Sequence, residues 1–145
     1  HFALFIVIPV VMVGWVPTLV GLLVASVVCG LCLAIVFQLA HVVSETSFTV
    51  LDPNSSKMED EWMIHQLSTT ANFATKNKFL TWILGGLNYQ VEHHLLPKIS
   101  HIHYPEINKL VKQTCQEFNV RYIEFATFTR AFQSHIKVIE NMGTA

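Results

Sequence analysis

The fold of this chain is decided by residues 2–40, which read FALFIVIPVVMVGWVPTLVGLLVASVVCGLCLAIVFQLA. Lys, Arg, Asp and Glu are absent not only from this block but from the whole of residues 1–44. All nine basic and all ten acidic residues therefore lie in residues 45–145, so an uncharged block is joined to an ordinary polar one. The formal net charge of −1 gives no reason to expect a nucleic-acid partner.

The uncharged block predicts two membrane-spanning helices joined by a turn. It is too long for one span, and the sequence Gly-Trp-Val-Pro at residues 14–17 breaks it. Residues 18–40 exceed the roughly 20 residues that cross a hydrocarbon core of about 30 Å. Residues 2–13 are short for a span, so we expect the chain to begin inside or beside that helix. Residues 1–44 are therefore predicted to form a transmembrane helical hairpin.

The distribution of basic residues predicts the orientation of this hairpin. Every Lys and Arg follows the second apolar segment, which by the positive-inside tendency places residues 45–145 in the cytoplasm. Trp15 then lies at the opposite membrane interface, where aromatic residues are common. Cys29 and Cys32 lie in the apolar segment and Cys115 in the cytoplasmic part, so all three are interpreted as reduced, small apolar side chains.

Residues 45–145 read as a helical domain, and the expected fold class is an all-α membrane protein. A turn is predicted at residues 52–56, and an extended segment at residues 120–126. On the helix that begins at Pro105, the apolar positions are Ile107, Leu110, Val111, Cys115 and Phe118. The helices are predicted at residues 59–70, 78–96 with an interruption at Gly85–Gly86, 105–119 and 127–143.

Residues 88–97, NYQVEHHLLP, carry the strongest chemical signal. On a helix Gln90, His93 and His94 stand at i, i+3 and i+4 and project from one side. Neutral imidazole is the commonest protein ligand for redox-active first-row metals. The alternative is a polar patch on a solvated helix, but the apolar residues 82–84 and 95–96 favour a buried location. A membrane metalloenzyme is therefore the leading hypothesis.

Other histidines differ in how well their positions suit a metal. His41 stands on the last turn of the second apolar segment, on the same helical face as Gln38, and is a candidate ligand. His65 is interpreted as an outer or surface residue. His101 and His103 lie in a connector and are interpreted as non-ligands, and His135 fits ordinary core packing.

The pattern Gln90-Val91-Glu92-His93-His94 behind two apolar segments resembles the third histidine box of membrane fatty acid desaturases, (H or Q)-x-x-H-H. Gln at its first position resembles the front-end subgroup, which inserts a double bond between an existing one and the carboxyl end. The resemblance covers the whole chain as a C-terminal portion, with residues 1–44 as the third and fourth spans of the parent protein. The two earlier histidine boxes of the family, H-x(3 or 4)-H and H-x(2 or 3)-H-H, do not occur here.

The resemblance implies a di-iron centre held almost wholly by histidines. By this carry-over His41, His93 and His94 are iron ligands, and Gln90 binds weakly, binds through water or serves as an outer donor. Ligating imidazoles need outer partners for their second nitrogen, and the candidates here are Gln38 first, then Glu92 and His65.

The resemblance also implies the partners of the reaction. They are a long-chain unsaturated acyl group on coenzyme A or a lipid, dioxygen, and two electrons from a cytochrome b5 or a ferredoxin. The membrane is the bacterial inner membrane or the endoplasmic reticulum, with the histidines facing the cytoplasm.

Three alternatives remain open from the sequence. One is a related di-iron hydroxylase or a sphingolipid desaturase, whose boxes look alike. Another is a non-catalytic membrane relative that has lost its metal. Zinc is a third, but it needs closed tetrahedral ligation and the chain offers three obvious histidines. We expect the 145 residues by themselves to be inactive, because the resemblance places half of the ligand set elsewhere.

Overall fold

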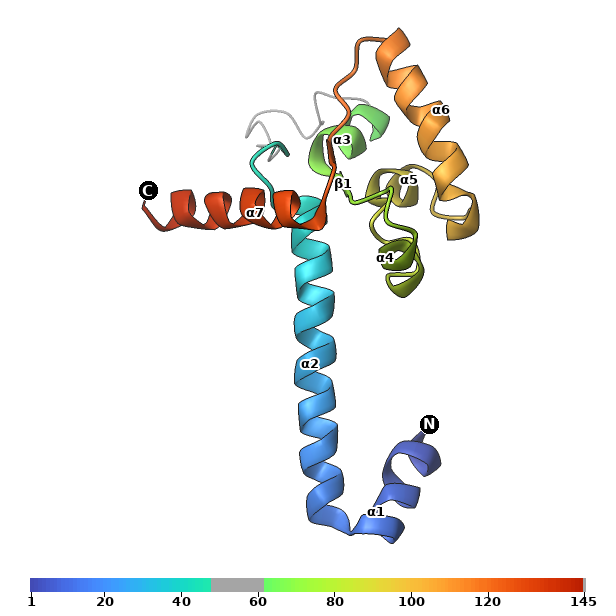
Figure 1. Ribbon diagram of the computed structural model, residues 1–145, viewed down its shortest axis with the longest axis vertical. Coiled ribbons are helices and arrows are strands. Elements are labelled where there is room, and N and C mark those ends of the chain that lie inside the picture. Colours follow the sequence, from blue (N-terminus) through green and yellow to red (C-terminus); the bar gives the residue numbers. More distant parts are fainter. Residues whose placement is uncertain (48–61, 145) are drawn as a thin grey trace, which may run out of the picture. The chain divides into compact units, whose positions relative to one another are not determined.

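The computed structural model describes residues 1–47 and 62–144. The chain divides into two compact units, residues 1–35 and residues 36–145. Helices make up most of both units (Figure 1). The turn predicted at residues 52–56 and the first residues of the helix predicted to begin at residue 59 lie outside the described residues.

The first unit contains the predicted break in the apolar block, and Gly14 makes it. Gly14 has φ 91° and ψ 168°, a conformation that favours glycine because a Cβ would be strained there. The Thr18 hydroxyl donates a 2.7 Å hydrogen bond to the Gly14 carbonyl and joins the turn to the next helix. The helical segments are the π-helical η1 (Ala3–Val7), α1 (Ile8–Val13) and α2 (Trp15–His41).

Helix α2 has the length and composition of a membrane span. Its 27 residues rise about 40 Å at 1.5 Å per residue, and none of them is Lys, Arg, Asp or Glu. Large apolar side chains point outward along it, for example Leu23 at 65% and Leu31 at 59% exposure. In the part of the chain that the structure describes, α2 is the one helix that meets both criteria, and the apolar helix over residues 3–13 is shorter.

The second unit is built around the C-terminal end of α2. Val36, Leu39 and Ala40 are buried there with Phe73 and Ala131 from distant parts of the sequence. The helical segments that surround this core are α3 (Trp62–Thr69), α4 (Lys78–Ile83), α5 (Gln90–Leu95), the 3₁₀ segment η2 (His101–His103), α6 (Tyr104–Glu117) and α7 (Phe128–Gly143).

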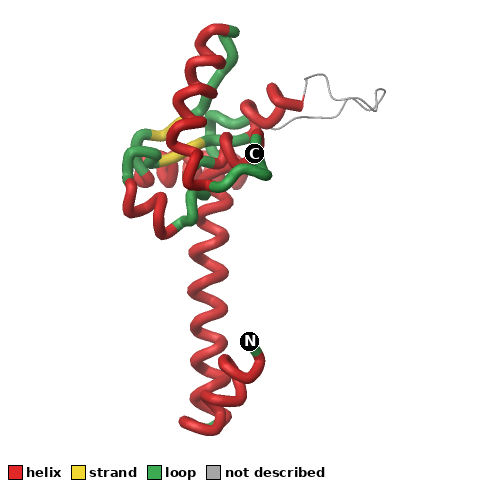
Figure 2. Tube along the Cα trace, turned by 90° about the vertical axis from the view of Figure 1, so that its right-hand side faces the viewer, coloured by secondary structure: helices red, strands yellow, loops and turns green. Residues whose placement is uncertain are grey.

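A short parallel strand pair departs from the expected all-α fold class. Strand β1 (Asn72–Phe73) pairs with β2 (Glu124–Phe125), within the segment predicted to be extended (Figure 2). The Ala71 amide donates to the Ala40 carbonyl, so the same backbone segment also bonds to the end of α2. Buried backbone groups need partners, and this pairing provides them where three segments meet.

The helix predicted at residues 78–96 is two separate helices, α4 and α5. Gly85 and Gly86 have φ of +56° and +80°, which ends the helix instead of merely weakening it. Space is also tight at Gly86, where an added Cβ would lie 2.6 Å from the Cβ of His101. The break turns α5 independently of α4 and lets the segment after Pro97 pack against the turn.

The apolar positions noted on α6 are not all buried. Leu110 and Phe118 are 64% and 73% exposed, whereas Tyr104, Asn108 and Cys115 are buried. The helix is rotated so that the polar Asn108 faces inward, where it hydrogen-bonds to a buried carboxylate on α5. This polar contact, which periodicity does not reveal, decides the orientation of the helix.

Candidate metal centre

Three of the four candidate ligands gather in the second unit as imidazole rings in mutual contact. The ring of His41, at the end of α2, lies 4.9 Å from that of His94 on α5, measured between centroids. The rings of His93 and His94 are 5.8 Å apart, and both pairs are edge-on. The end of α2 and α5 therefore bring together residues that are more than fifty positions apart in the sequence.

The ends of α2 and α5 both rest on α3, which supplies partners for two of the rings. His41 Nδ1 lies 3.3 Å from the Thr69 carbonyl oxygen. His94 Nδ1 lies 2.9 Å from the Gln66 side-chain oxygen. Both oxygens accept a hydrogen bond from Nδ1–H. This leaves Nε2 of each ring as the nitrogen with a lone pair for a metal.

The third ring, His93, is held by α6. Its Nδ1 is 3.1 Å from the hydroxyl of Tyr104, the first residue of that helix. Burial raises the pKa of Tyr104, and the nearby Glu92 raises it further, so the phenol stays protonated. All three histidines thus have Nδ1 occupied, in the manner of ligating imidazoles with an outer hydrogen-bond partner.

The surroundings of His94 favour its neutral form. Burial lowers the pKa of His94, and the neighbouring His41 and His93 lower it further. A neutral ring keeps a lone pair for a metal, whereas a protonated ring repels a cation. A neutral His94 can therefore offer a lone pair to a metal without first releasing a proton.

Gln90, the fourth candidate, is 1% exposed and carries an unsatisfied amide. Among the described residues, neither its Nε2 nor its Oε1 has a hydrogen-bond partner. A buried polar group without a partner costs about 1–3 kcal/mol. An amide facing a metal-bound water or weakly ligating a metal would be satisfied, so this orphaned group fits a metal beside α5. Within residues 1–47 and 62–144, however, no group of three or more His, Cys, Asp or Glu is arranged to hold a metal ion by itself.

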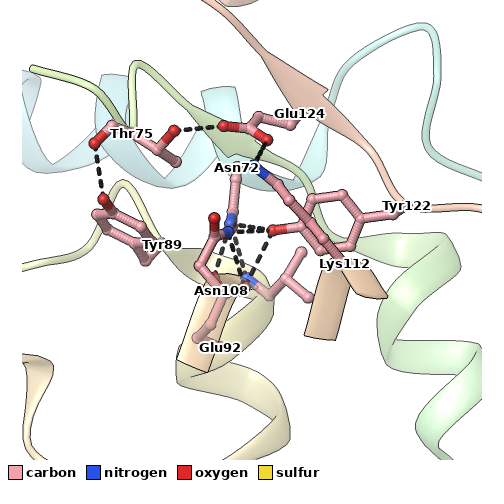
Figure 3. Close-up of polar contacts among 9 residues, drawn as sticks. Asn72, Thr75, Tyr89, Glu92, Asn108, Lys112, Tyr122 and Glu124 are labelled. Atoms are coloured by element: carbon pink, nitrogen blue, oxygen red, sulfur yellow. Dashed lines mark hydrogen bonds and ion pairs between the residues drawn. The ribbon is translucent and has the colours of Figure 1, made fainter. Parts of the chain in front are cut away.

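Glu92 lies between the ligand candidates in sequence but has a different set of contacts. It is fully buried, and its Oε1 accepts hydrogen bonds from Asn108 Nδ2 and the Tyr122 hydroxyl, each at 3.0 Å. Its Oε2 accepts from Asn72 Nδ2 at 2.6 Å (Figure 3). An ionised carboxylate is purely an acceptor, and all of these partners donate. Glu92 therefore joins α5 to β1, to α6 and to Tyr122 in the segment before β2.

The Glu92 cluster also holds the backbone of α5. Asn72 Oδ1 accepts a 2.9 Å hydrogen bond from the Val91 amide, so one side chain contacts both the carboxylate and the first turn of the helix. Burial raises the pKa of Tyr122, and Glu92 raises it further, so this phenol remains a donor. The cluster sets where α5 lies, and with it the positions of His93 and His94.

The remaining predicted site residues lie at the margin of the cluster. Gln38 is exposed, and the structure gives the Nδ1 of His41 the Thr69 carbonyl as its partner. His65 is half-buried, and its carbonyl accepts from the Ser68 and Thr69 hydroxyls. His101 and His103, interpreted as non-ligands, are exposed.

Sequence reasoning missed the residues that orient the rings and the helix. Gln66 directly follows His65, which the sequence singled out. The other missed residues stand far from the His93–His94 pair in the sequence. Polar side chains on the inner faces of α3 and α6 were the available signal. The missed residues are Gln66, Thr69, Asn72, Tyr104, Asn108 and Tyr122.

The fold and the site define a helical protein with a long apolar helix and a cluster of histidine rings at the end of that helix. The sequence profile of the family described as fatty acid desaturase matches residues 1–126, so the chain belongs to the fatty acid desaturase family. This confirms the resemblance seen in residues 88–97.

Curated relatives agree with the family. The chain is 46% identical to an sn-1 linoleoyl-lipid 6-desaturase of Synechocystis sp., over 88% of this chain and 35% of the relative. It is 40% identical to the sn-1 linoleoyl-lipid 6-desaturase of Arthrospira platensis, over 97% of this chain and 38% of the relative. An acyl-lipid (8-3)-desaturase of Physcomitrium patens is 39% identical, over 87% of this chain and 26% of the relative. The chain thus spans about a third of the length of these relatives, and no solved structure matches it.

Proposed function

We propose that the chain is the C-terminal part of a front-end membrane fatty acid desaturase. The enzyme inserts a double bond into a long-chain unsaturated acyl group at a di-iron centre. The observation that carries the proposal is the gathering of three imidazoles from two distant segments, each with Nδ1 bonded to an outer partner. Family membership supports the same chemistry.

In this proposal His41, His93 and His94 hold iron through Nε2. Gln90 lies beside them and is satisfied by a metal-bound water or by weak ligation. The family pattern places further histidines in the other two boxes, which complete the set. When bound, the irons supply the oxidising power that removes two hydrogen atoms from adjacent methylene groups, with dioxygen as the oxidant.

The overall reaction balances with an external electron donor. The two substrate hydrogens, two donor electrons and two protons reduce dioxygen to two waters, and the acyl chain gains one double bond. We propose cytochrome b5 or a ferredoxin as the donor. The names of the relatives favour a lipid over coenzyme A as the acyl carrier.

The chain's own residues orient the cluster and keep the pKa of His94 low. Thr69, Gln66 and Tyr104 fix the three rings, and the buried Glu92 fixes the helix that carries two of them. Burial keeps the pKa of His94 low, so that a lone pair is available.

We also propose that α2 spans the membrane and that the histidines face the cytoplasm. The length and apolar surface of α2 support a span. The restriction of Lys and Arg to residues after it supports the orientation. The membrane is the bacterial inner membrane or the endoplasmic reticulum.

The test uses the full-length protein and its His93→Ala and His94→Ala variants. We expect the parent protein to bind iron and to give a product with one more double bond by mass spectrometry. Each variant should lose iron and turnover. His103→Ala, which changes an exposed imidazole, serves as the matched control and should keep both.

Two results would contradict the proposal. Full iron content and turnover in either variant would remove that histidine from the ligand set. A hydroxylated product would replace the desaturase with the related hydroxylase.

A further inference from the structure

A cavity of about 590 Å³ lies in the second unit, lined mainly by α4, η2 and α6, and none of the three clustered histidines is among its described lining residues. Its walls are apolar or aromatic where Trp82, Tyr89, Ile102 and Pro105 line it. The Tyr89 hydroxyl donates to the Thr75 carbonyl at 2.6 Å, which fixes that ring at the wall (Figure 3). The volume is in the range of small-molecule sites, about 300–1,000 Å³.

The charged residues that line this cavity are all lysines. Lys76, Lys78, Lys109 and Lys112 line it, and none of its described lining residues is acidic. Lys112 is already paired with Glu124, the one ion pair found within residues 1–47 and 62–144. Three exposed lysines in the described part of the chain therefore have no carboxylate of their own, and they face a shared space.

The apolar side chains beside the cavity resemble those of a segment in contact with lipid. On α4, Phe79, Trp82 and Ile83 are 69%, 77% and 56% exposed. The rings of Phe79 and Trp82 lie 6.4 Å apart. Lys76 and Lys78 stand at the start of the same helix. Aromatic and basic residues together are typical of segments at the level of lipid headgroups.

From this combination we infer that the cavity between α4 and α6 is a binding site for the phosphate group of an anionic lipid. The phosphate lies among Lys76, Lys78 and Lys109, and the exposed side chains of α4 enter the adjoining apolar layer. A soluble phosphate compound would use the lysines but would leave these apolar residues in water, so a lipid fits better. This site rests on the proposed function only in that the protein lies at a membrane.

The site touches the metal cluster through α6. Pro105 and Asn108 line the cavity, and Tyr104, the residue before Pro105, contacts the ring of His93. Asn108 also donates to Glu92. A lipid headgroup seated here contacts the helix that positions one of the proposed ligands.

The experiment measures lipid binding to the full-length protein in nonionic detergent by calorimetry. The probes are dihexanoyl phosphatidylglycerol, a neutral dihexanoyl glycolipid, coenzyme A and inorganic phosphate. The variant combines Lys76→Gln, Lys78→Gln and Lys109→Gln. The matched control, with the same change in charge away from the cavity, combines Lys98→Gln, Arg130→Gln and Lys137→Gln.

We expect the cavity variant to bind the phosphatidylglycerol at least about tenfold more weakly, since each lysine near an anionic headgroup contributes on the order of 1 kcal/mol. The control should change by less than about twofold, and the glycolipid should bind both variants alike. If the control variant bound phosphatidylglycerol as weakly as the cavity variant, general surface charge would explain the effect. That result would overturn the proposed site. Binding of coenzyme A or phosphate as tight as that of the lipid, with the same dependence on the three lysines, would overturn the lipid assignment.

Iron content, measured on the same samples, separates this inference from the proposed function. The cavity variant should keep its iron, because none of its changed residues contacts the three imidazoles. A protein without iron that still binds the lipid through these lysines would contradict the desaturase proposal alone. A protein with iron whose lipid binding ignores these lysines would contradict the lipid site alone.

Discussion

Replacement of Glu92 by glutamine tests how strongly the buried carboxylate holds the histidine-bearing helix. Glu92 accepts hydrogen bonds from Asn72, Asn108 and Tyr122 and has no exposed surface. Glutamine has the same shape but one oxygen in place of two. If the glutamine oxygen takes the position of Oε1, it still accepts from Asn108 and Tyr122. The glutamine NH₂ then faces the NH₂ of Asn72, so the third bond is lost. Asn72 is not free to turn over, because its own oxygen accepts from the Val91 amide.

The size of the effect follows from these contacts. Loss of the bond to Asn72 removes one charge-assisted hydrogen bond, about 1.5–3 kcal/mol. The two bonds that remain become neutral and weaken by about 0.5 kcal/mol or more each. We therefore expect Glu92→Gln to lower the free energy of unfolding by about 3 kcal/mol, which at about 3 °C per kcal/mol is a fall of about 9 °C in Tm.

Thermal unfolding of the full-length protein, followed by tryptophan fluorescence in detergent, measures this change. Iron content should fall as well, since the backbone that carries His93 and His94 loses an anchor. Glu117→Gln is the control, because Glu117 is exposed and, in the described part of the chain, accepts only from Gln113 on its own helix. Its Tm should change by less than about 2 °C. A Glu92→Gln protein that unfolds within 2 °C of the parent would refute the view that the carboxylate organises this cluster.

Three further substitutions test single contacts. Gln66→Leu removes the acceptor at His94 Nδ1 and should weaken iron binding about 10- to 100-fold in competition with a chelator. Gly86→Ala adds a Cβ 2.6 Å from that of His101 at a φ of +80°, and should lower the free energy of unfolding by about 2 kcal/mol or more in a thermal melt. His135→Ala leaves a buried backbone carbonyl without its 2.7 Å partner and should cost about 1 kcal/mol, while iron content and most of the turnover remain.

Each of these has a matched control in the same unit. Gln113→Leu changes an exposed amide on α6, and its iron affinity should stay as in the parent. If Gln113→Leu lost as much iron affinity as Gln66→Leu, the contact of Gln66 with His94 would not explain the loss. Gly85→Ala also has a positive φ, +56°, but open space around it, so it carries the backbone cost alone and should be milder than Gly86→Ala. Loss of iron in His135→Ala, but not in His103→Ala, would contradict the separation of His135 from the metal cluster.

Much of the local structure follows from the sequence by itself. The uncharged residues 2–40 predict two apolar helices joined at Gly-Trp-Val-Pro, and the break is found at Gly14. The spacing of His93 and His94 places both on α5, and the box pattern indicates the family. These features are local or periodic, so propensity, hydropathy and motif spacing are enough to determine them.

Only the tertiary structure decided which side chains complete the site. The partners of the three rings come from α3 and α6, and those of Glu92 come from segments 16 to 30 residues away. The inward rotation of α6 around Asn108 and the parallel pairing of β1 with β2 likewise depend on distant residues. Nothing in the spacing of one segment encodes a hydrogen bond to another. Such partners are chosen when segments pack and each buried polar group must find a donor or an acceptor.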